Sequence, residues 1–275
     1  MNTFLIILVV SILLFALLVF LVSPAKSSKM QREPFQNKNI AHRGLHSKDK
    51  KIPENSMAAF REAIQAGYGI ELDIQFSKDE KIVVFHDNTL KRVCGVDKRV
   101  DDLTYDELKE LSLCDTKERI PLFSDFLTLV NGSVPLIVEL KNGPKNTLLC
   151  EKAYELLINY NGNYCVESFQ PFIVSWFRKH APSVLRGQLS APASEFKGEI
   201  KPYESFALSH LLTNVAARPH FVAYHKCKRS LLVKLCDALG GMRVVWTVKD
   251  TDDIKKIESK NDAVIFEFYH PEIDY

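Results

Sequence analysis

Several features that would mark common protein classes are missing from this sequence of 275 residues. Its six cysteines have no CxxC spacing, which argues against a zinc site and a compact disulfide framework. The net charge is only +2 and no long basic run occurs, so a partner nucleic acid is not indicated. The chain also lacks internal repeats and a Gly-rich dinucleotide fingerprint after its first predicted strand, which counts against a Rossmann fold.

The first segment lacks charge, proline and glycine. From Phe4 to Val22 every residue is apolar except Ser11. A helix of this length rises roughly 28 Å, about the hydrocarbon thickness of a bilayer. A cleaved signal peptide would have a basic start, a shorter apolar stretch and a clear cleavage site. The pattern therefore predicts a transmembrane anchor over residues 1–23.

Basic residues follow this segment, and none precedes it. Lys26, Lys29 and Arg32 come just after the predicted span, which by the positive-inside tendency places the rest of the chain in the cytoplasm. The scattered cysteines agree with a reducing compartment. We therefore expect a single-pass protein of the cell membrane, in which residues 24–37 form a polar linker near anionic headgroups.

Residues 38–275 alternate between β-type runs and amphipathic stretches, which predicts an α/β fold with a parallel sheet. About eight repeats favour a (β/α)8 TIM barrel, and the long stretch 87–133 predicts a small insertion over its mouth. Nine strands are candidates for eight places, so at least one is wrong or lies outside the barrel. The candidates are Asn39–Ala41, Tyr68–Gln75, Lys81–Phe85, Pro135–Lys141, Tyr164–Phe169, Val184–Leu189, His220–Tyr224, Arg243–Val248 and Ala263–Phe266.

Acidic residues fall inside two of these apolar strands. Glu71 and Asp73 are two residues apart, so both carboxylates point to the same face of the sheet. Glu139 and Lys141 repeat this spacing, which alone would more often be a structural ion pair. Buried carboxylates are costly unless they are paired or bind a cation. Together Glu71, Asp73 and Glu139 form a plausible oxygen cage for a divalent metal, Mg²⁺ or Ca²⁺.

Histidines close two of the predicted strands. His42 follows the first strand and His86 the third, where they suit a general acid and a general base. Arg43 offers a planar donor fork for a phosphate, and Gly44 lets the backbone approach closely. Glu54 could face the mouth of the barrel, and Asn55 or Ser56 could cap the helix that follows.

These motifs, in this order, resemble those of glycerophosphodiester phosphodiesterases. No single motif is specific, but the ordered set is, and it covers nearly everything after residue 38. The set is His-Arg-Gly at 42–44, Pro-Glu-Asn-Ser at 53–56, Glu-Leu-Asp at 71–73, His-Asp at 86–87, Ile-Pro-Leu at 120–122, Glu-Leu-Lys at 139–141, Glu-Ser-Phe at 167–169 and Val-Trp-Thr-Val at 245–248.

The resemblance implies a TIM barrel and metal-dependent hydrolysis of glycerophosphodiesters to glycerol 3-phosphate and an alcohol. The roles it implies are assigned position by position. His42 and His86 are the acid/base pair; Glu71, Asp73 and Glu139 hold the metal; Arg43 and Lys141 contact the phosphate; Glu54 and Asn55 support the metal site; Phe169 and Trp246 line the cleft.

The chain departs from the family pattern at two places. Ser56 stands where the family usually has Thr, which keeps the hydroxyl. Near the C-terminus the family reads Asp-Gly, two apolar residues and Thr-Asp-x-Pro, whereas this chain runs from Asp262 to Pro271 without the Thr-Asp pair. The second departure concerns substrate detail rather than the core chemistry.

Two alternatives to a glycerophosphodiesterase remain open. A lysophospholipase D, or a phospholipase C-like enzyme on a related barrel, would share the histidines and carboxylates, and the anchor would hold it near lipid. A tethered binding protein without catalysis is the non-enzyme alternative, but every expected site residue is present. The expected partners are a glycerophosphodiester or lysolipid substrate and, through the N-terminal helix, the membrane.

Overall fold

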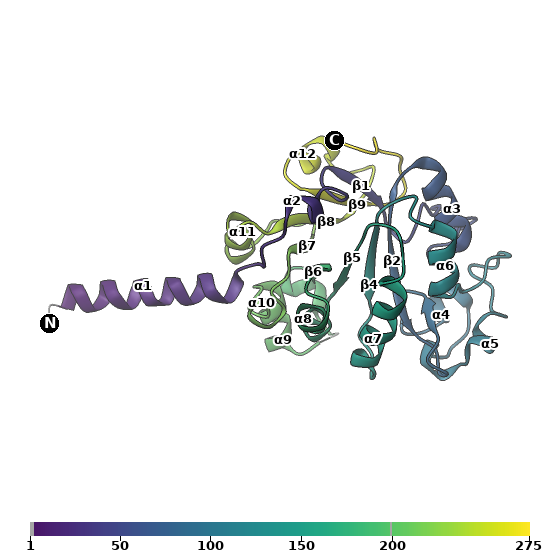
Figure 1. Cartoon of the computed structure of the whole chain (residues 1–275), viewed down its shortest axis with the longest axis horizontal. Helices are drawn as coiled ribbons and strands as arrows, with labels where there is room; N and C mark the ends of the chain where they lie inside the picture. The colour runs from purple at the N-terminus through teal and green to yellow at the C-terminus, as the bar shows by residue number, and fades with distance from the viewer. Residues whose placement is uncertain (1–2, 199) are drawn as a thin grey trace.

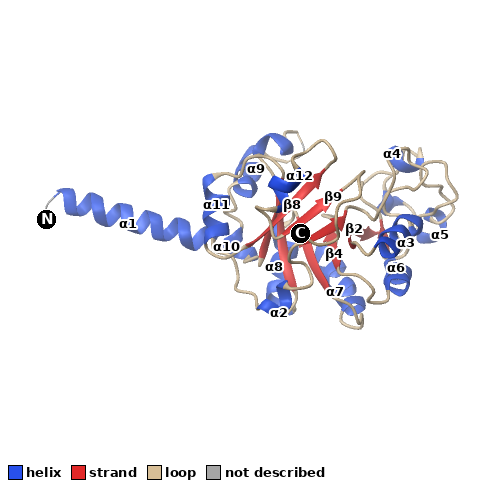
Figure 2. Cartoon of the chain, turned by 90° about the horizontal axis from the view of Figure 1, so that it is seen from above, coloured by secondary structure: helices blue, strands red, loops and turns tan. Residues whose placement is uncertain are grey.

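The computed structural model describes residues 3–198 and 200–275 (Figure 1). Residues 1 and 2 of the predicted anchor and residue 199 of the predicted barrel lie outside this description. One long helix, α1 (Thr3–Val22), projects from an α/β body (Figures 1 and 2). The strands of the body are β1 (Lys38–Ala41), β2 (Gly69–Phe76), β3 (Ile82–Val84), β4 (Leu136–Leu140), β5 (Tyr164–Ser168), β6 (Leu185–Ser190), β7 (Phe221–His225), β8 (Met242–Val248) and β9 (Ala263–Phe266).

Helices surround these strands, which appear in red at the centre of Figure 2. Ser56 caps α3 by accepting the backbone N–H of Ala59, and Ser230 caps α11 in the same way from Val233. The helical elements are α2 (Lys29–Arg32), α3 (Met57–Ala66), α4 (Lys91–Cys94), η1 (Val100–Asp102), α5 (Tyr105–Leu108), α6 (Phe123–Val130), α7 (Asn146–Leu157), α8 (Pro171–His180), η2 (Ala193–Phe196), α9 (Pro202–Ser209), α10 (Asn214–Ala217), α11 (Leu231–Ala238) and α12 (Ile254–Glu258).

Eight parallel strands close into a barrel, which confirms the predicted TIM-barrel fold. They run in the order β1, β2, β4, β5, β6, β7, β8 and β9, and β1 pairs with both β9 and β2. The strand predicted at 81–85 is the one outside the barrel. It forms β3, which pairs antiparallel with β2 so that Val84 lies opposite Ile74.

The predicted insertion follows β3. It contains α4, η1 and α5 and packs around its own apolar cluster, which includes Val93, Val100 and Leu108. In Figure 2 this part of the chain lies at the end of the molecule opposite α1. α6 then resumes the barrel and packs against α3 through Phe60 and Phe126, whose rings meet edge to face at 4.5 Å.

Strand register places the ionisable residues on the inner face of the barrel. Asp73 of β2 pairs with Glu139 of β4, which in turn pairs with Glu167 of β5. Two residues earlier, Ile137 and Cys165 belong to an apolar cluster inside the barrel. Because side chains alternate along a strand, the carboxylates form a polar layer above this apolar one.

α1 is the one helix among the described residues that is long and apolar enough to cross a membrane. The segment predicted as a linker after it is in contact with the body. It contains the four-residue helix α2, the Gln31 side chain donates to Ser183 O at 2.8 Å, and Arg32 donates to Gly240 O at 2.8 Å. The chain therefore enters β1 along a fixed path.

His220, a buried imidazole directly before β7, should make the stability of the fold depend on pH. Burial and the charge of Arg186 lower its pKa from 6.5 to about 4, and its Nδ1 accepts the backbone N–H of Arg186. The unfolded chain therefore takes up a proton between these pH values while the folded chain does not. The free energy of unfolding should fall by about 3 kcal/mol as pH drops from 6.5 toward 4.

The measurement is thermal unfolding of the detergent-solubilised full chain across this pH range. His220→Asn keeps an acceptor but cannot be protonated, so its unfolding temperature should decline less steeply than that of the wild type. His42 titrates in both proteins, and the difference between them isolates His220. Parallel pH curves for the two proteins would contradict the assignment.

Candidate active site

The turn after β1 carries His42, Arg43 and Gly44 at the rim of the barrel. The backbone N–H of His42 donates to Phe266 O of β9, and that of Arg43 donates to Glu71 Oε2 at 3.0 Å. Arg43 and Gly44 both have positive φ, 53° and 77°. A Cβ at Gly44 would lie 2.9 Å from the backbone of Ala59, so only glycine allows the turn to pack this closely on α3.

Three buried carboxylates gather next to this turn. Glu71, Asp73 and Glu139 each place an oxygen within 4.8 Å of the other two. Asn55 donates to Asp73 Oδ2 at 2.9 Å, and Lys141 donates to Glu139 Oε1 at 2.8 Å. Asp73 Oδ1 is buried and accepts no hydrogen bond among the described residues, although Lys141 Nζ lies 3.3 Å away. An oxygen cluster with an unused acceptor fits a hard divalent cation.

A fourth carboxylate, Glu167, adds to the negative charge of this layer. It is buried, and its Oε2 has no hydrogen-bond partner in the described chain. Burial, and then the charges of neighbouring carboxylates, raise the pKa of Glu167 and Glu71 well above the ordinary value. Burial also raises the pKa of Glu139, although Lys141 opposes it. Without a cation these carboxyl groups resist ionisation, because Lys141 and Arg43 balance only part of the negative charge that the cluster would carry.

A chain of polar contacts orients His42. Its Nδ1 lies 3.0 Å from Glu267 Oε2, and its Nε2 faces Glu71 Oε2 at 3.9 Å. Glu267 also forms an ion pair with Lys249, at 2.9 Å from Nζ to Oε1, and its Oε2 lies 3.6 Å from Nε2 of His46. Burial and the charge of Arg43 lower the pKa of His42 to about 4. The imidazole is therefore neutral at pH 7, and a proton on Nδ1 leaves Nε2 free toward the carboxylates.

His86 is held by a second network that reaches into the insertion. Its Nδ1 lies 2.6 Å from Asp87 Oδ1, and Arg92 of α4 bridges Asp87 and Glu54 with contacts of 2.7 Å to each. Glu54 in turn accepts from Arg43 at 2.7 Å. Burial would raise the pKa of Glu54, but bonds and charge from Arg92 and Arg43 lower it to about 2. Arg92 thus connects the supports of His86 and Arg43.

The reason why His86 reaches the site differs from the sequence-based expectation. His86 does not follow a barrel strand, because β3 pairs antiparallel with the last three residues of β2. It returns to the carboxylates because the Phe85 N–H donates to Asp73 O at 3.0 Å and Gln75 Nε2 donates to Phe85 O at 2.8 Å. His86 lies close enough to Asp73 and Glu139 to contribute to lowering the pKa of both carboxyls.

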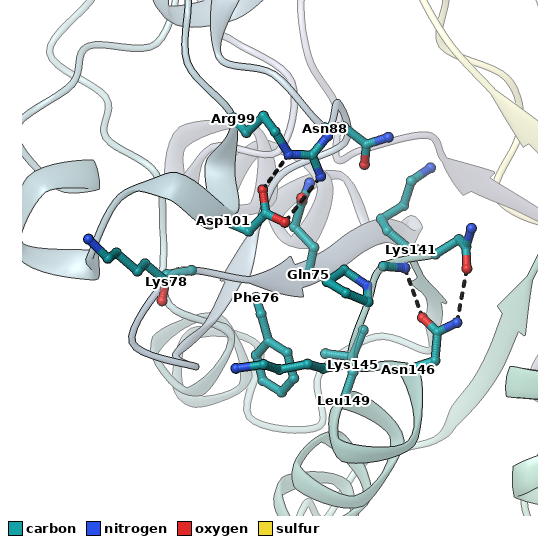
Figure 3. Close-up of a pocket in the computed structure, with 14 residues that line it drawn as sticks. Gln75, Phe76, Lys78, Asn88, Arg99, Asp101, Lys141, Lys145, Asn146 and Leu149 are labelled. Carbon is teal, nitrogen blue, oxygen red and sulfur yellow. Dashed lines mark hydrogen bonds and ion pairs between the residues drawn. The ribbon is translucent and has the colours of Figure 1, made fainter.

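A pocket opens beside the cluster, between the end of β2, the insertion and the start of α7 (Figure 3). Its lining includes Lys78, Asn88, Lys141 and Lys145, so most of its polar side chains are positive or amide groups. Phe169 and Trp246 do not line this pocket. They pack edge to face with ring centres 5.6 Å apart, and Trp246 donates from its indole to Ala223 O.

The sequence-based residues fall into two groups in space. Nine of them form the cluster and its immediate supports: His42, Arg43, Glu54, Asn55, Glu71, Asp73, His86, Glu139 and Lys141. Phe169 and Trp246 lie in an aromatic group with Phe196. Four contributors were missed. Asp87 and Glu167 stand within motifs already noted, Glu267 directly follows β9, and Arg92 has no sequence signal.

Comparisons with known proteins agree on one family. Residues 42–270 match the profile described as the glycerophosphoryl diester phosphodiesterase family. A glycerophosphodiester phosphodiesterase of Caldanaerobacter subterraneus is 29% identical over 247 residues, covering 82% of this chain and 92% of that protein. A human lysophospholipase D is 33% identical over 151 residues, covering 50% of this chain and 46% of that protein.

Solved structures support the fold. A phosphodiesterase from Oleispira antarctica, in complex with the product sn-glycerol-3-phosphate, superposes with a TM-score of 0.70 at 23% identity. The match covers 87% of this chain and 96% of that one. At this identity the likeness concerns the barrel architecture.

Proposed function

Because the chain belongs to the glycerophosphoryl diester phosphodiesterase family and is a phosphoric diester hydrolase, we propose that it hydrolyses glycerophosphodiesters to glycerol 3-phosphate and an alcohol with the help of a divalent cation. The observation that carries the proposal is the buried carboxylate layer faced by two histidines. Each histidine is oriented through its Nδ1 by a carboxylate, Glu267 for His42 and Asp87 for His86.

Glu71, Asp73 and Glu139 are the residues proposed to hold the cation, either Mg²⁺ or Ca²⁺. The cation would neutralise charge on the phosphodiester and on its departing oxygen. Asn55 keeps Asp73 in place, and Glu54 keeps Arg43 beside Asp73, at 3.4 Å from Nε to Oδ2. These supports orient the proposed ligand Asp73 through neighbouring side chains.

The two histidines share the proton transfers in this proposal. One imidazole removes a proton from the nucleophile, which is water or the glycerol 2-hydroxyl of the substrate. The bond between phosphorus and the alcohol oxygen breaks, and the other imidazole protonates that oxygen. Attack by water gives glycerol 3-phosphate directly. Attack by the 2-hydroxyl gives a cyclic glycerol phosphate, which a water molecule must then open to glycerol 3-phosphate. Arg43 and Lys141 contact the phosphate. Phe169 and Trp246 are proposed to line the cleft from the aromatic group that they form with Phe196, outside the pocket of Figure 3.

Glu267 should matter through its bond to His42. Glu267→Gln removes the negative charge and can also turn its NH2 group toward Nδ1, which favours the other imidazole tautomer, so kcat should fall about 10- to 100-fold while KM changes little. Glu267→Asp keeps the charge and should recover part of the loss, which a general folding defect would not allow. Steady-state kinetics measures kcat and KM of both variants. Glu110→Gln, at an exposed glutamate of the insertion, is the control and should leave both values unchanged. A rise in KM at unchanged kcat would instead place Glu267 in substrate binding.

A lysophospholipase D activity is the second candidate, because a relative with that name is 33% identical over half of this chain. The discriminating experiment is an activity screen with metal titration. Glycerophosphocholine and lysophosphatidylcholine are assayed side by side, with Mg²⁺ or Ca²⁺, for the full chain and for a chain without α1. Faster turnover of glycerophosphocholine supports the first proposal, and faster turnover of the lysolipid supports the second. No hydrolysis of any diester with either metal would refute both.

We also propose that α1 anchors the enzyme in the cell membrane with the barrel in the cytoplasm, as the basic residues after the helix suggest. Carbonate washing should leave the full chain in the membrane fraction. Protease added outside intact cells should leave the barrel uncut. Release of a shortened, soluble barrel would instead identify residues 1–23 as a cleaved signal.

A further inference from the structure

The last turn of α1 is part of the packing of the barrel. Val22 is fully buried, and together with Leu21 it joins an apolar cluster formed by α11 and β7. Leu232 and Leu235 of α11 belong to the same cluster. Figures 1 and 2 both place α10 and α11 beside the end of α1 from which the chain enters the body. α11 therefore lies alongside the last turn of α1.

Polar contacts fix this junction further. Asn214 Nδ2 donates to Val22 O at 3.1 Å, and Arg218 donates to Phe20 O at 2.6 Å and to Ser23 O at 3.0 Å. The Arg218 guanidinium also lies 4.6 Å from the centre of the Phe20 ring. These bonds satisfy carbonyls that a helix end leaves free, and they place a cation at the negative end of the dipole. The barrel is thereby held at one orientation to the anchor.

The length of α1 determines how close α11 lies to the hydrocarbon of the bilayer. Twenty helical residues rise about 30 Å, so the whole of α1 is needed to cross the hydrocarbon of a bilayer. Its last turn must then lie at the boundary between acyl chains and headgroups. Because α11 packs against that turn, α11 lies at the same level.

The outward side of α11 has the chemistry of such a boundary. Leu231 is 81% exposed and Leu239 is 40% exposed, while Val233 and Cys236 face the barrel. Lys228 and Lys234 are exposed beside Leu231. The acidic residue of the helix, Asp237, is paired with Arg229 at 2.8 Å. Neither lysine has a carboxylate partner among the described residues, and an exposed apolar side chain between such positive charges is favourable at an anionic lipid surface.

We propose that α11 is a second membrane contact, in which Leu231 inserts among the acyl chains and Lys228 and Lys234 bind anionic phospholipid headgroups. This inference rests on the proposed anchoring of α1. Its consequence is that the barrel does not swing freely on its anchor. One flank of it, formed by α10 and α11, stays against the bilayer.

The test uses Leu231→Trp in the full chain, reconstituted into vesicles of equal phosphatidylcholine and phosphatidylglycerol. The matched control is Ile158→Trp, because Ile158 is also exposed (61%) but follows α7, which both figures place away from α1. The two native tryptophans are subtracted using the wild-type chain. Brominated acyl chains should quench most of the emission added at 231 and none of that added at 158.

The second part of the test removes the positive charge of the two lysines. Lys228→Glu combined with Lys234→Glu should reduce quenching at 231 in the mixed vesicles but leave it unchanged in phosphatidylcholine alone. Flotation after a carbonate wash tests the premise separately, since a chain that does not float lacks the anchor. A chain that floats but shows equal quenching at 231 and 158 overturns the proposal. So does disulfide cross-linking of Leu231→Cys between two copies, which would assign this face to a dimer.

Discussion

Alanine at either His42 or His86 is expected to lower kcat on a glycerophosphodiester by about 10²- to 10⁴-fold, the usual contribution of a positioned acid or base. Metal affinity should stay close to that of the wild type. The side chain of Glu71 keeps its bond from the Arg43 backbone, and Asp73 keeps its bond from Asn55, in both variants. Steady-state kinetics and calorimetric titration of the cation measure the two effects separately.

The leaving group distinguishes the two histidines. From a nitrophenyl diester the leaving group is nitrophenolate, which departs without needing a proton. The variant that lacks the general acid should therefore recover most of its rate on this substrate. The variant that lacks the general base should not recover. His180→Ala, at an exposed histidine on α8, serves as the control. Substantial turnover of the natural diester by both site variants would sink the acid/base assignment.

How much of this site could be predicted depends on whether each contact is local in the sequence. Glu71 and Asp73 were predictable because alternation along one strand puts them on one face. The same reasoning gave Glu139, whose register with Asp73 follows from parallel pairing of β2 and β4. The reasoning for His86 was incomplete, because an antiparallel β3 could not be distinguished from a barrel strand by its apolar pattern alone.

Contacts that form only when the barrel closes could not be predicted from the sequence. Glu267 meets His42 only because β9 pairs with β1, and these strands lie at opposite ends of the body in sequence. Reading residues 262–271 as a lost motif therefore overlooked a carboxylate that the fold returns to the site. Arg92 belongs to an insertion whose path is set by its own core, so no spacing rule connects it to Glu54. The position of α11 against α1 is of the same kind, since it needs the final packing of two distant helices.

Removal of the divalent cation is expected to abolish turnover, and its return should restore it. The same cation should stabilise the fold, because binding to the folded state alone adds about 2.7 kcal/mol at a hundredfold excess over Kd. Chelator followed by Mg²⁺ or Ca²⁺, with both activity and unfolding temperature recorded, measures these effects. Full activity in chelator would refute the role of the cation.

Glu71→Gln should reverse the order of the unfolding temperatures of variant and wild type between chelator and saturating cation. Burial and the neighbouring carboxylates raise the pKa of Glu71, so its charge is a cost to the fold when no cation is present. A neutral amide removes that repulsion and can still accept the Arg43 N–H. The variant should therefore unfold at a higher temperature than the wild type in chelator, and at a lower one with saturating cation. If the variant is less stable than the wild type under both conditions, Glu71 is a structural acceptor and the cation is held elsewhere. The reversed order of unfolding temperatures thus distinguishes a metal ligand from a residue that only packs, without relying on activity.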